Sequence, residues 1–332
     1  MTALAPHLTA FLRQHLPVER RASPATLDTY AHALRLLVCF VAERLSVRPS
    51  ALSVEALAPP LVLDFLNHLE TRRGNSARTR NARLAAVNSL FRYLEYRVPS
   101  CLDQAQRIRA IPVKRTDEAL VRHLAREEVQ ALLDAPNPGI ASGARDRAML
   151  HLAFAAGLRV SELVGLRLDD LRLAPEPVVH VMGKGRRERR LPLWRETAAA
   201  LRSWLAVRQG ERDPALFLSA RGRAMTRAGF EYVLAKHAGT AARSCPSLKS
   251  KRVTPHVLRH SCAMHMLQAT HDIRRVSLWL GHVSLQSTEV YLRADPTEKL
   301  EALNAAAAPS LRRGQFRPPD TLIAMLQGSR LP

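Results

Sequence analysis

The stretch "TPHVLRH", residues 254–260, places a histidine and an arginine at the start of a predicted helix. Thr254 is a typical N-cap residue, and Pro255 suits the first helical position. His256 and Arg259 then lie three residues apart, on the same side of the first turn. An imidazole and a guanidinium beside the positive end of a helix dipole form a favourable site for an anion.

The rest of the chain is also strongly basic. Its 332 residues contain 50 Lys+Arg against 29 Asp+Glu, a formal net charge of +21. This balance favours a nucleic-acid partner, because the release of counterions drives basic proteins onto polyanions. A membrane partner is not expected, since no basic amphipathic helix, lipidation signal, signal peptide or sufficiently long apolar run is found. We therefore expect a cytoplasmic protein.

The length predicts two domains. Residues 1–108 are expected to form a helical domain, because apolar residues recur there at three- and four-residue steps. Residues 109–123 are basic, contain Pro112 and predict a linker. Residues 124–332 are expected to form the second domain, with a tail from about residue 309.

The second domain is predicted to be mainly α with a small β-sheet. The runs "PVVHVM" and "RERRLPL" flank the turn "GKG" at residues 183–185, which predicts a β-hairpin with Lys184 between the turn glycines. The helix before residue 157 is expected to end at Gly157 in a left-handed cap. Arg159 follows in the connection, and Ser161 can cap the next helix.

Three arginines stand near the start of the helix predicted at residues 75–97: Arg78, Arg80 and Arg83. They can form a solvated helix face, as runs of charge usually do. They can also lie against a DNA groove and contact phosphates and base edges. The pattern leaves both interpretations open, and the three arginines are candidate DNA-binding residues.

A series of motifs in the second domain resembles that of the tyrosine recombinase (phage integrase) family. The motifs are "GLRVSEL", "GKGRRERRLPL", "PHVLRHSCAMHML", "LWLGH" and "STEVY", in this order, and they cover residues 124–300. The N-terminal helices resemble the core-binding domain of that family more loosely. The resemblance implies a SAM-like helical core-binding domain and an α+β catalytic domain, which together form a C-shaped clamp on DNA.

The resemblance also assigns six positions to catalysis: Arg159, Lys184, His256, Arg259, His282 and Tyr291. It implies that the two arginines hold the scissile phosphate. This agrees with general chemistry, since a guanidinium offers a fork of donors to non-bridging phosphate oxygens and stabilises the charge of the transition state.

Tyr291, nine residues after His282, is the implied nucleophile. A lone tyrosine is more often a core residue, so the motif series and not the tyrosine itself favours this role. A phenol has an ordinary pKa near 10 and needs a proton acceptor, a part that suits His256 and His282. Lys184 is the implied general acid for the departing 5′-oxygen, and Arg187 in place of a common family lysine leaves it as the only lysine of the hairpin.

The resemblance implies no metal and no cofactor. Rejoining is expected to need no ATP, because the 3′-phosphotyrosine bond itself conserves the energy. The four cysteines (Cys39, Cys101, Cys245 and Cys262) form no metal-ligand motif and are expected to be reduced. One departure concerns Thr270, which stands where the family often has glycine. Because a β-branched residue tolerates a left-handed cap poorly, we expect that helix end to take another shape.

The expected function is site-specific recombination of double-stranded DNA, in integration, excision, transposition or resolution. The resemblance implies a tetramer on two paired sites, formed from free monomers or dimers. Two alternatives remain open: a type IB topoisomerase-like enzyme that relaxes DNA, and a catalytically silent DNA-binding protein. The tail segment "PDTLIAMLQ" is expected either to pack on a neighbouring subunit or to be disordered.

Overall fold

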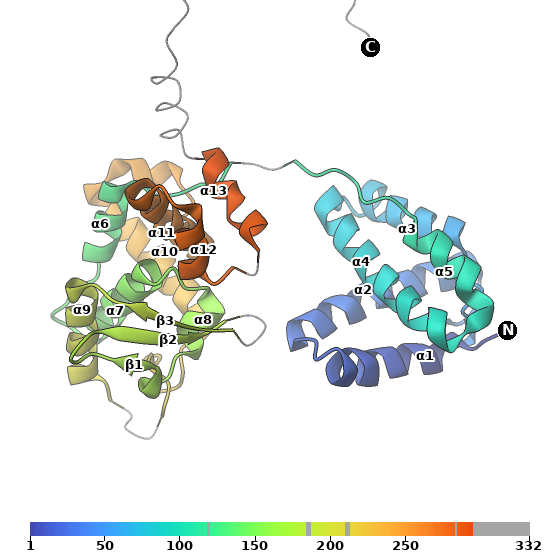
Figure 1. Cartoon of the computed structure of the whole chain (residues 1–332), viewed down its shortest axis with the longest axis horizontal. Helices are drawn as coiled ribbons and strands as arrows, with labels where there is room; N and C mark the ends of the chain where they lie inside the picture. The colour runs from blue at the N-terminus through green and yellow to red at the C-terminus, as the bar shows by residue number, and fades with distance from the viewer. Residues whose placement is uncertain (118–119, 184–186, 210–212, 283, 295–332) are drawn as a thin grey trace, which may run out of the picture. The chain divides into compact units, whose positions relative to one another are not determined.

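The computed structural model describes residues 1–117, 120–183, 187–209, 213–282 and 284–294 (Figure 1). The chain divides into two compact units between residues 118 and 119, within the segment predicted as a linker. Lys184 and the tail lie outside the described residues. The first unit is called the N-terminal unit, and the second, which contains the expected catalytic residues, is called the catalytic unit.

The N-terminal unit is built from helices. They are α1 (Leu4–Ala10), which continues into the π-helical segment η1 (Phe11–Glu19), α2 (Pro24–Arg44), α3 (Pro59–Thr71), α4 (Ala77–Arg97) and α5 (Leu102–Arg109), with 3-10 turns at Pro49–Ala51 and Pro99–Cys101. Ser23 and Ser76 cap α2 and α4, each accepting a backbone N–H at 3.3 Å. These caps fix the starts of α2 and α4, the second of which is the helix predicted at residues 75–97.

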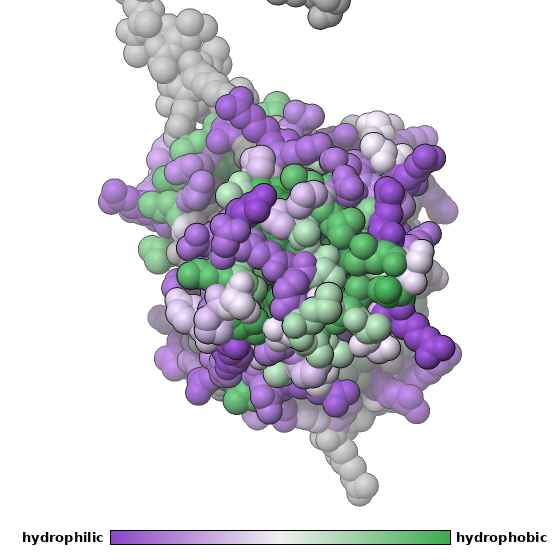
Figure 2. Space-filling view, turned by 90° about the vertical axis from the view of Figure 1, so that its right-hand side faces the viewer, coloured by the Kyte–Doolittle hydropathy of each residue, from purple (hydrophilic) through white to green (hydrophobic). Residues whose placement is uncertain are grey.

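The core of this unit lies between α2, α3 and α4. Leu37, Val62 and Phe91, one from each helix, are fully buried in it. By length and composition α2 could cross a membrane, which the sequence analysis did not anticipate, but its buried face identifies it as a core helix. Figure 2 shows one face of this unit, on which hydrophilic side chains surround a smaller hydrophobic area.

The catalytic unit packs helices around a small sheet (Figure 1). Its elements are α6 (Arg126–Asp134), α7 (Ala141–Ala155), α8 (Val160–Gly165), β1 (Leu171–Arg172), β2 (Val178–Met182), β3 (Glu188–Pro192), α9 (Arg195–Val207), α10 (Arg227–Ser244), α11 (Pro255–Thr270), α12 (Ile273–Leu280) and α13 (Glu289–Ala294), with 3-10 turns at Leu168–Asp170, Pro246–Ser250 and Leu285–Ser287.

The predicted β-hairpin is confirmed. β2 and β3 pair antiparallel, from Val178 opposite Pro192 to Met182 opposite Glu188, and β1 adds a short third strand on the other side of β2. Alternate residues point inward, so that Val179, Val181 and Leu191 join the main core. The hairpin is thereby fixed to the body of the unit at its base.

Two helix boundaries differ from the sequence analysis. Ser161 does not cap α8, which begins at Val160, because the Glu162 carboxylate accepts the Arg159 N–H at 3.0 Å and takes over that task. The end of α11 does have a left-handed cap, contrary to the expectation drawn from Thr270. The left-handed residue is His271 (φ 50°), which tolerates this conformation better than a β-branched residue does.

Candidate active site

The site begins with a buried carboxylate that holds two arginines. Glu162 of α8 accepts from Arg159 Nη1 at 2.8 Å and from Arg189 Nη2 of β3 at 2.7 Å. Its side chain is only 4 % exposed. Burial alone raises the pKa of this carboxyl, but the hydrogen bonds from Arg189 and Arg159 outweigh burial and lower it. Glu162 therefore stays ionised and fixes the Arg159 guanidinium in one orientation.

Arg259 reaches the same carboxylate from the first turn of α11, with Nη1 at 3.8 Å from Glu162 Oε2. Its buried guanidinium donates to the carbonyl of Gly157 and, at 2.7 Å, to that of Leu280. These carbonyls lie at the C-terminal ends of α7 and α12, where the helix dipole favours a cation. Burial and the nearby Arg159 lower the pKa of Arg259 to about 10, so it remains charged at neutral pH.

Two glycines allow this close packing. Gly157 is the predicted left-handed residue after α7 (φ 55°), and a Cβ there would come within 2.7 Å of Leu280 Cδ2. Gly281 ends α12 (φ 63°), and a Cβ there would lie 3.1 Å from Arg189 Nη1. The left-handed conformation favours glycine at both positions, and any larger residue would also have to displace the Leu280 or Arg189 side chain.

Tyr291 is buried next to His282. It is 1 % exposed and packs in a small cluster with residues such as Met264 and Leu280. The ring of His282 is nearly parallel to that of Tyr291, at 11° and 6.4 Å between centroids. His282 Nδ1 lies 2.8 Å from the hydroxyl of the buried Thr288. Tyr291 thus has the burial of a core residue and the neighbours of a reactive one.

The hydroxyl of Tyr291 has a partner that the sequence analysis did not single out. Nδ1 of His260 lies 2.9 Å from it, and the two rings meet edge to face. Burial lowers the pKa of His260 and of His282 to about 4 each, and burial raises the pKa of Tyr291 to about 12. At neutral pH both imidazoles are therefore uncharged and can accept a proton, while the phenol keeps its own.

The structure brings together four of the six predicted catalytic residues. Arg159 and Arg259 both act electrostatically on His282 and on Tyr291. The fifth, His256, is exposed at the edge of the group, with its ring 6.5 Å from that of His260.

The sixth, Lys184, lies outside the described residues. Gly183, just before it, adjoins the arginine cluster: a Cβ there would lie 3.2 Å from Arg189 Nη1 and 3.6 Å from Glu162 Oε1.

The three candidate DNA-binding arginines differ in exposure. Arg78 is exposed and Arg83 is half-buried, but Arg80 is only 3 % exposed. Nη1 of Arg80 donates to the carbonyl of Pro112 at 2.8 Å and to Asn81 at 3.2 Å. Arg80 therefore anchors the segment after α5 and is not at the surface of the N-terminal unit.

Three residues of the site were missed from the sequence: Glu162, Arg189 and His260. Glu162 carries the clearest signal, because it stands three residues after Arg159, at the spacing of a capping box. His260 stands four residues after His256, which places both on one face of α11. Arg189 stands two residues before the inward-facing Leu191, so the strand period places it on the inner side of β3.

The described residues include no group of three or more His, Cys, Asp or Glu side chains that could hold a metal ion. The four cysteines are free thiols. Cys262 is buried, at 5 % exposure, and burial raises its pKa to about 12.

The chain has a helical N-terminal unit, and its catalytic unit brings together two arginines, histidines and a tyrosine. This combination is typical of the tyrosine recombinases. Residues 122–298 match the model of the phage integrase family, and residues 8–97 match that of the phage integrase N-terminal SAM-like domain. The chain belongs to the phage integrase family.

Known proteins similar to the chain carry recombinase names. It is 44 % identical over 324 residues to the integrase/recombinase candidate y4rC of Sinorhizobium fredii, covering 98 % of each chain. It is 35 % identical to the tyrosine recombinase XerC of Myxococcus xanthus, covering 93 % of this chain and 99 % of that one. The crystal structure of XerH recombinase bound to difH substrate, a pre-cleavage complex, is similar with a TM-score of 0.63 at 25 % identity, over 86 % and 80 % of the two chains.

The Glu162 carboxylate gives a first prediction. Glu162→Gln removes the charge and turns one acceptor into a donor facing an arginine, so we expect covalent DNA adducts to form about 10- to 100-fold more slowly. Glu128→Gln is the matched control, because Glu128 is equally buried at the start of α6 and also accepts a backbone N–H, from Ala125. Both variants should lose thermal stability, measured by circular dichroism. If both lose adduct formation equally, Glu162 has no special role.

Proposed function

We propose that the chain cleaves and rejoins double-stranded DNA at specific sites through a 3′-phosphotyrosyl intermediate. The observation that carries this proposal is that Arg159 and Arg259 lie at one buried carboxylate and both act on Tyr291. Such a pair of fixed cations suits a phosphodiester and not a neutral substrate. The retained hydroxyl of Tyr291 argues against a silent DNA-binding protein.

The proposed reaction is a phosphoryl transfer without net change in bond energy. The Tyr291 oxygen forms a bond to phosphorus, its proton passes to a neutral imidazole, and the bond to the 5′-oxygen breaks. Arg159 and Arg259 stabilise the charge on the non-bridging oxygens, with His256 and His282 assisting. Lys184 protonates the departing 5′-oxygen. Rejoining is the same path in reverse, and it requires no ATP.

Trapping the intermediate tests this proposal. A duplex nicked close to the cleavage position loses a short fragment after cutting, so the covalent adduct accumulates and is seen on a denaturing gel. We expect adducts to form in EDTA, because the proposed groups are all side chains of the chain itself. Adducts that need magnesium, or DNA ends without bound protein, would contradict it.

We propose that the N-terminal unit contacts DNA through α4, by way of Arg78 and Arg83. Arg78→Ala should weaken binding to all duplexes alike and reduce the slope of log affinity against log salt by about 1. Arg80→Ala is the control from the same helix. It should lower the melting temperature through the lost bond to Pro112 and leave the salt slope unchanged. Equal salt slopes for the wild type and Arg78→Ala would show that Arg78 is not part of the DNA interface.

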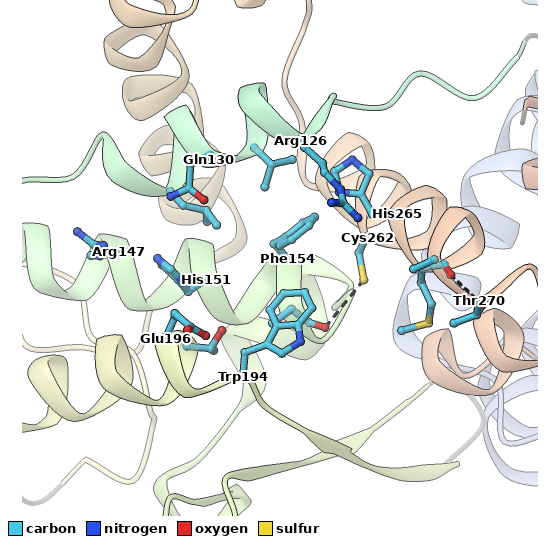
Figure 3. A pocket seen from close by; sticks show the side chains of 16 residues that line it. Arg126, Gln130, Arg147, His151, Phe154, Trp194, Glu196, Cys262, His265 and Thr270 are labelled. Carbon is cyan, nitrogen blue, oxygen red and sulfur yellow. Dashed lines mark hydrogen bonds between the residues drawn. The ribbon is translucent and has the colours of Figure 1, made fainter. Parts of the chain in front are cut away.

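We further propose that the enzyme acts in the cytoplasm as a tetramer on paired DNA sites, joined by the C-terminal tail. A pocket of about 580 Å³ in the catalytic unit can receive a neighbour's tail, with Phe154 and Trp194 at its centre (Figure 3). Two buried atoms of its lining residues, His151 Nε2 and Thr197 Oγ1, have no partner within the described residues. The tail segment 319–327 supplies apolar residues and polar groups that suit such a pocket.

The assembly of subunits on paired DNA sites tests whether the tail of one subunit binds the pocket of its neighbour. Removal of residues 309–332 and the substitution Trp194→Glu should each abolish complexes that contain two duplexes, in gel-shift or mass photometry. Cleavage by single subunits should continue. Tyr232→Glu is the control, because Tyr232 is an exposed aromatic residue of α10 that does not line the pocket. Unchanged assembly in both test variants would exclude this contact.

A further inference from the structure

The hydroxyl of Tyr291 is hidden in this structure. The whole residue is 1 % exposed, and its hydroxyl meets Nδ1 of His260 at 2.9 Å. A DNA phosphate is itself a charged group several ångströms wide and cannot reach an oxygen at the bottom of a packed cluster. The hydroxyl must therefore leave its partner before it can attack phosphorus.

His260 is well placed to hold the hydroxyl. It belongs to α11, the same helix that supplies Arg259 to the phosphate site, and it faces Tyr291 of α13. A phenol buried without a hydrogen-bond partner would be strongly disfavoured, so this one contact makes the buried position acceptable. His256 and Arg259 are the charged or titratable neighbours of His260 on its own helix, and Tyr291 faces it from α13.

We propose that His260 is a positioning residue for the nucleophile, which accepts the hydrogen bond of the Tyr291 hydroxyl and keeps it withdrawn until DNA is bound. The role of His260 rests on the proposed function in one respect only, namely that Tyr291 is the nucleophile. His260 acts through the tyrosine and does not touch the phosphate. Loss of the hydrogen bond shifts α13 toward conformations in which the hydroxyl is free.

Chemical access to Tyr291 tests the proposal without any DNA. Tetranitromethane nitrates accessible phenols, and peptide mass spectrometry resolves each tyrosine. In the wild type, Tyr96 (83 % exposed) and Tyr232 (71 % exposed) should react readily, and Tyr291 should react at a much lower, measurable rate. A net hydrogen bond corresponds to a change of about two- to tenfold in an equilibrium. His260→Leu should therefore raise the nitration of Tyr291 by about that factor and leave the two controls unchanged.

The conservative variant separates the hydrogen bond from simple packing. Asn in place of His260 keeps an acceptor close to the position of Nδ1, so His260→Asn should protect Tyr291 nearly as well as the wild type. If the Asn and Leu variants react equally, or if neither differs from the wild type, the hydrogen bond does not hold the tyrosine and the proposal is overturned.

A second measurement concerns activity. On the nicked duplex, His260→Leu should form adducts faster than the wild type in a single turnover, again by about two- to tenfold, with unchanged DNA affinity. Slower adduct formation that His260→Asn restores would make His260 a participant in the chemistry and contradict a withdrawing role. A protein that forms no adduct in any variant would refute the proposed function, while the nitration result would still decide the role of His260.

Discussion

Tyr291→Phe is expected to abolish the covalent DNA adduct while leaving folding and DNA affinity close to those of the wild type. The substitution keeps the ring in the cluster with Met264 and Leu280, so almost all of the buried apolar contact remains. It removes only the oxygen that lies 2.9 Å from His260 Nδ1, which should lower the free energy of unfolding by about 0.5–1.5 kcal/mol. Adduct formation should fall below detection, because phenylalanine has no nucleophilic atom.

The measurement is a denaturing gel of the nicked duplex, with gel-shift affinity and a melting curve on the same preparations. Tyr232→Phe is the control for the loss of a hydroxyl at an exposed position. An adduct that persists in Tyr291→Phe would mean that another side chain attacks, and the assignment of the site would fail. A variant that does not fold would show that the buried hydroxyl is structural.

Local signals in the sequence predicted most of the fold. Ser23, Ser76 and Thr254 each accept a backbone N–H at the start of a helix, as their residue types favour. Gly157 has the left-handed conformation that its position suggested. The hairpin followed from two short alternating runs around a glycine turn. These features depend on a few neighbouring residues, and tertiary packing did not override them.

The site was harder to predict where it depends on contacts between distant residues. Glu162 and Arg189 are 27 positions apart, and His260 and Tyr291 are 31 positions apart. Arg189 stands two residues before the inward-facing Leu191, and Arg80 stands four residues before the buried Leu84. The strand and helix periods therefore place both arginines on buried faces, but a charged side chain is not expected there from its residue type. The burial of Tyr291 was left open because a tyrosine in a core and a tyrosine in an active site have the same local sequence.

Lys184→Ala should cut ordinary DNA about a hundredfold to ten-thousandfold more slowly, the range expected for the loss of a general acid. The reason for this expectation is that Gly183 lies beside Arg189 and Glu162, so the residue before Lys184 is next to the carboxylate that holds Arg159. An alternative role is that the lysine only positions or screens the phosphate. Both roles predict a slow variant on ordinary DNA, so a second substrate is needed.

A duplex with sulfur at the 5′-bridging position distinguishes the two roles, because a thiolate departs with little protonation. If Lys184 is the general acid, Lys184→Ala should cut this substrate almost as fast as the wild type. Arg259→Lys should be slow on both substrates, since a lysine cannot reproduce the bonds to Gly157 and Leu280 or the fork of donors to the non-bridging oxygens. Equal impairment of Lys184→Ala on both substrates would assign the lysine to phosphate binding and make His256, the exposed imidazole at the edge of the site, the next candidate for the acid.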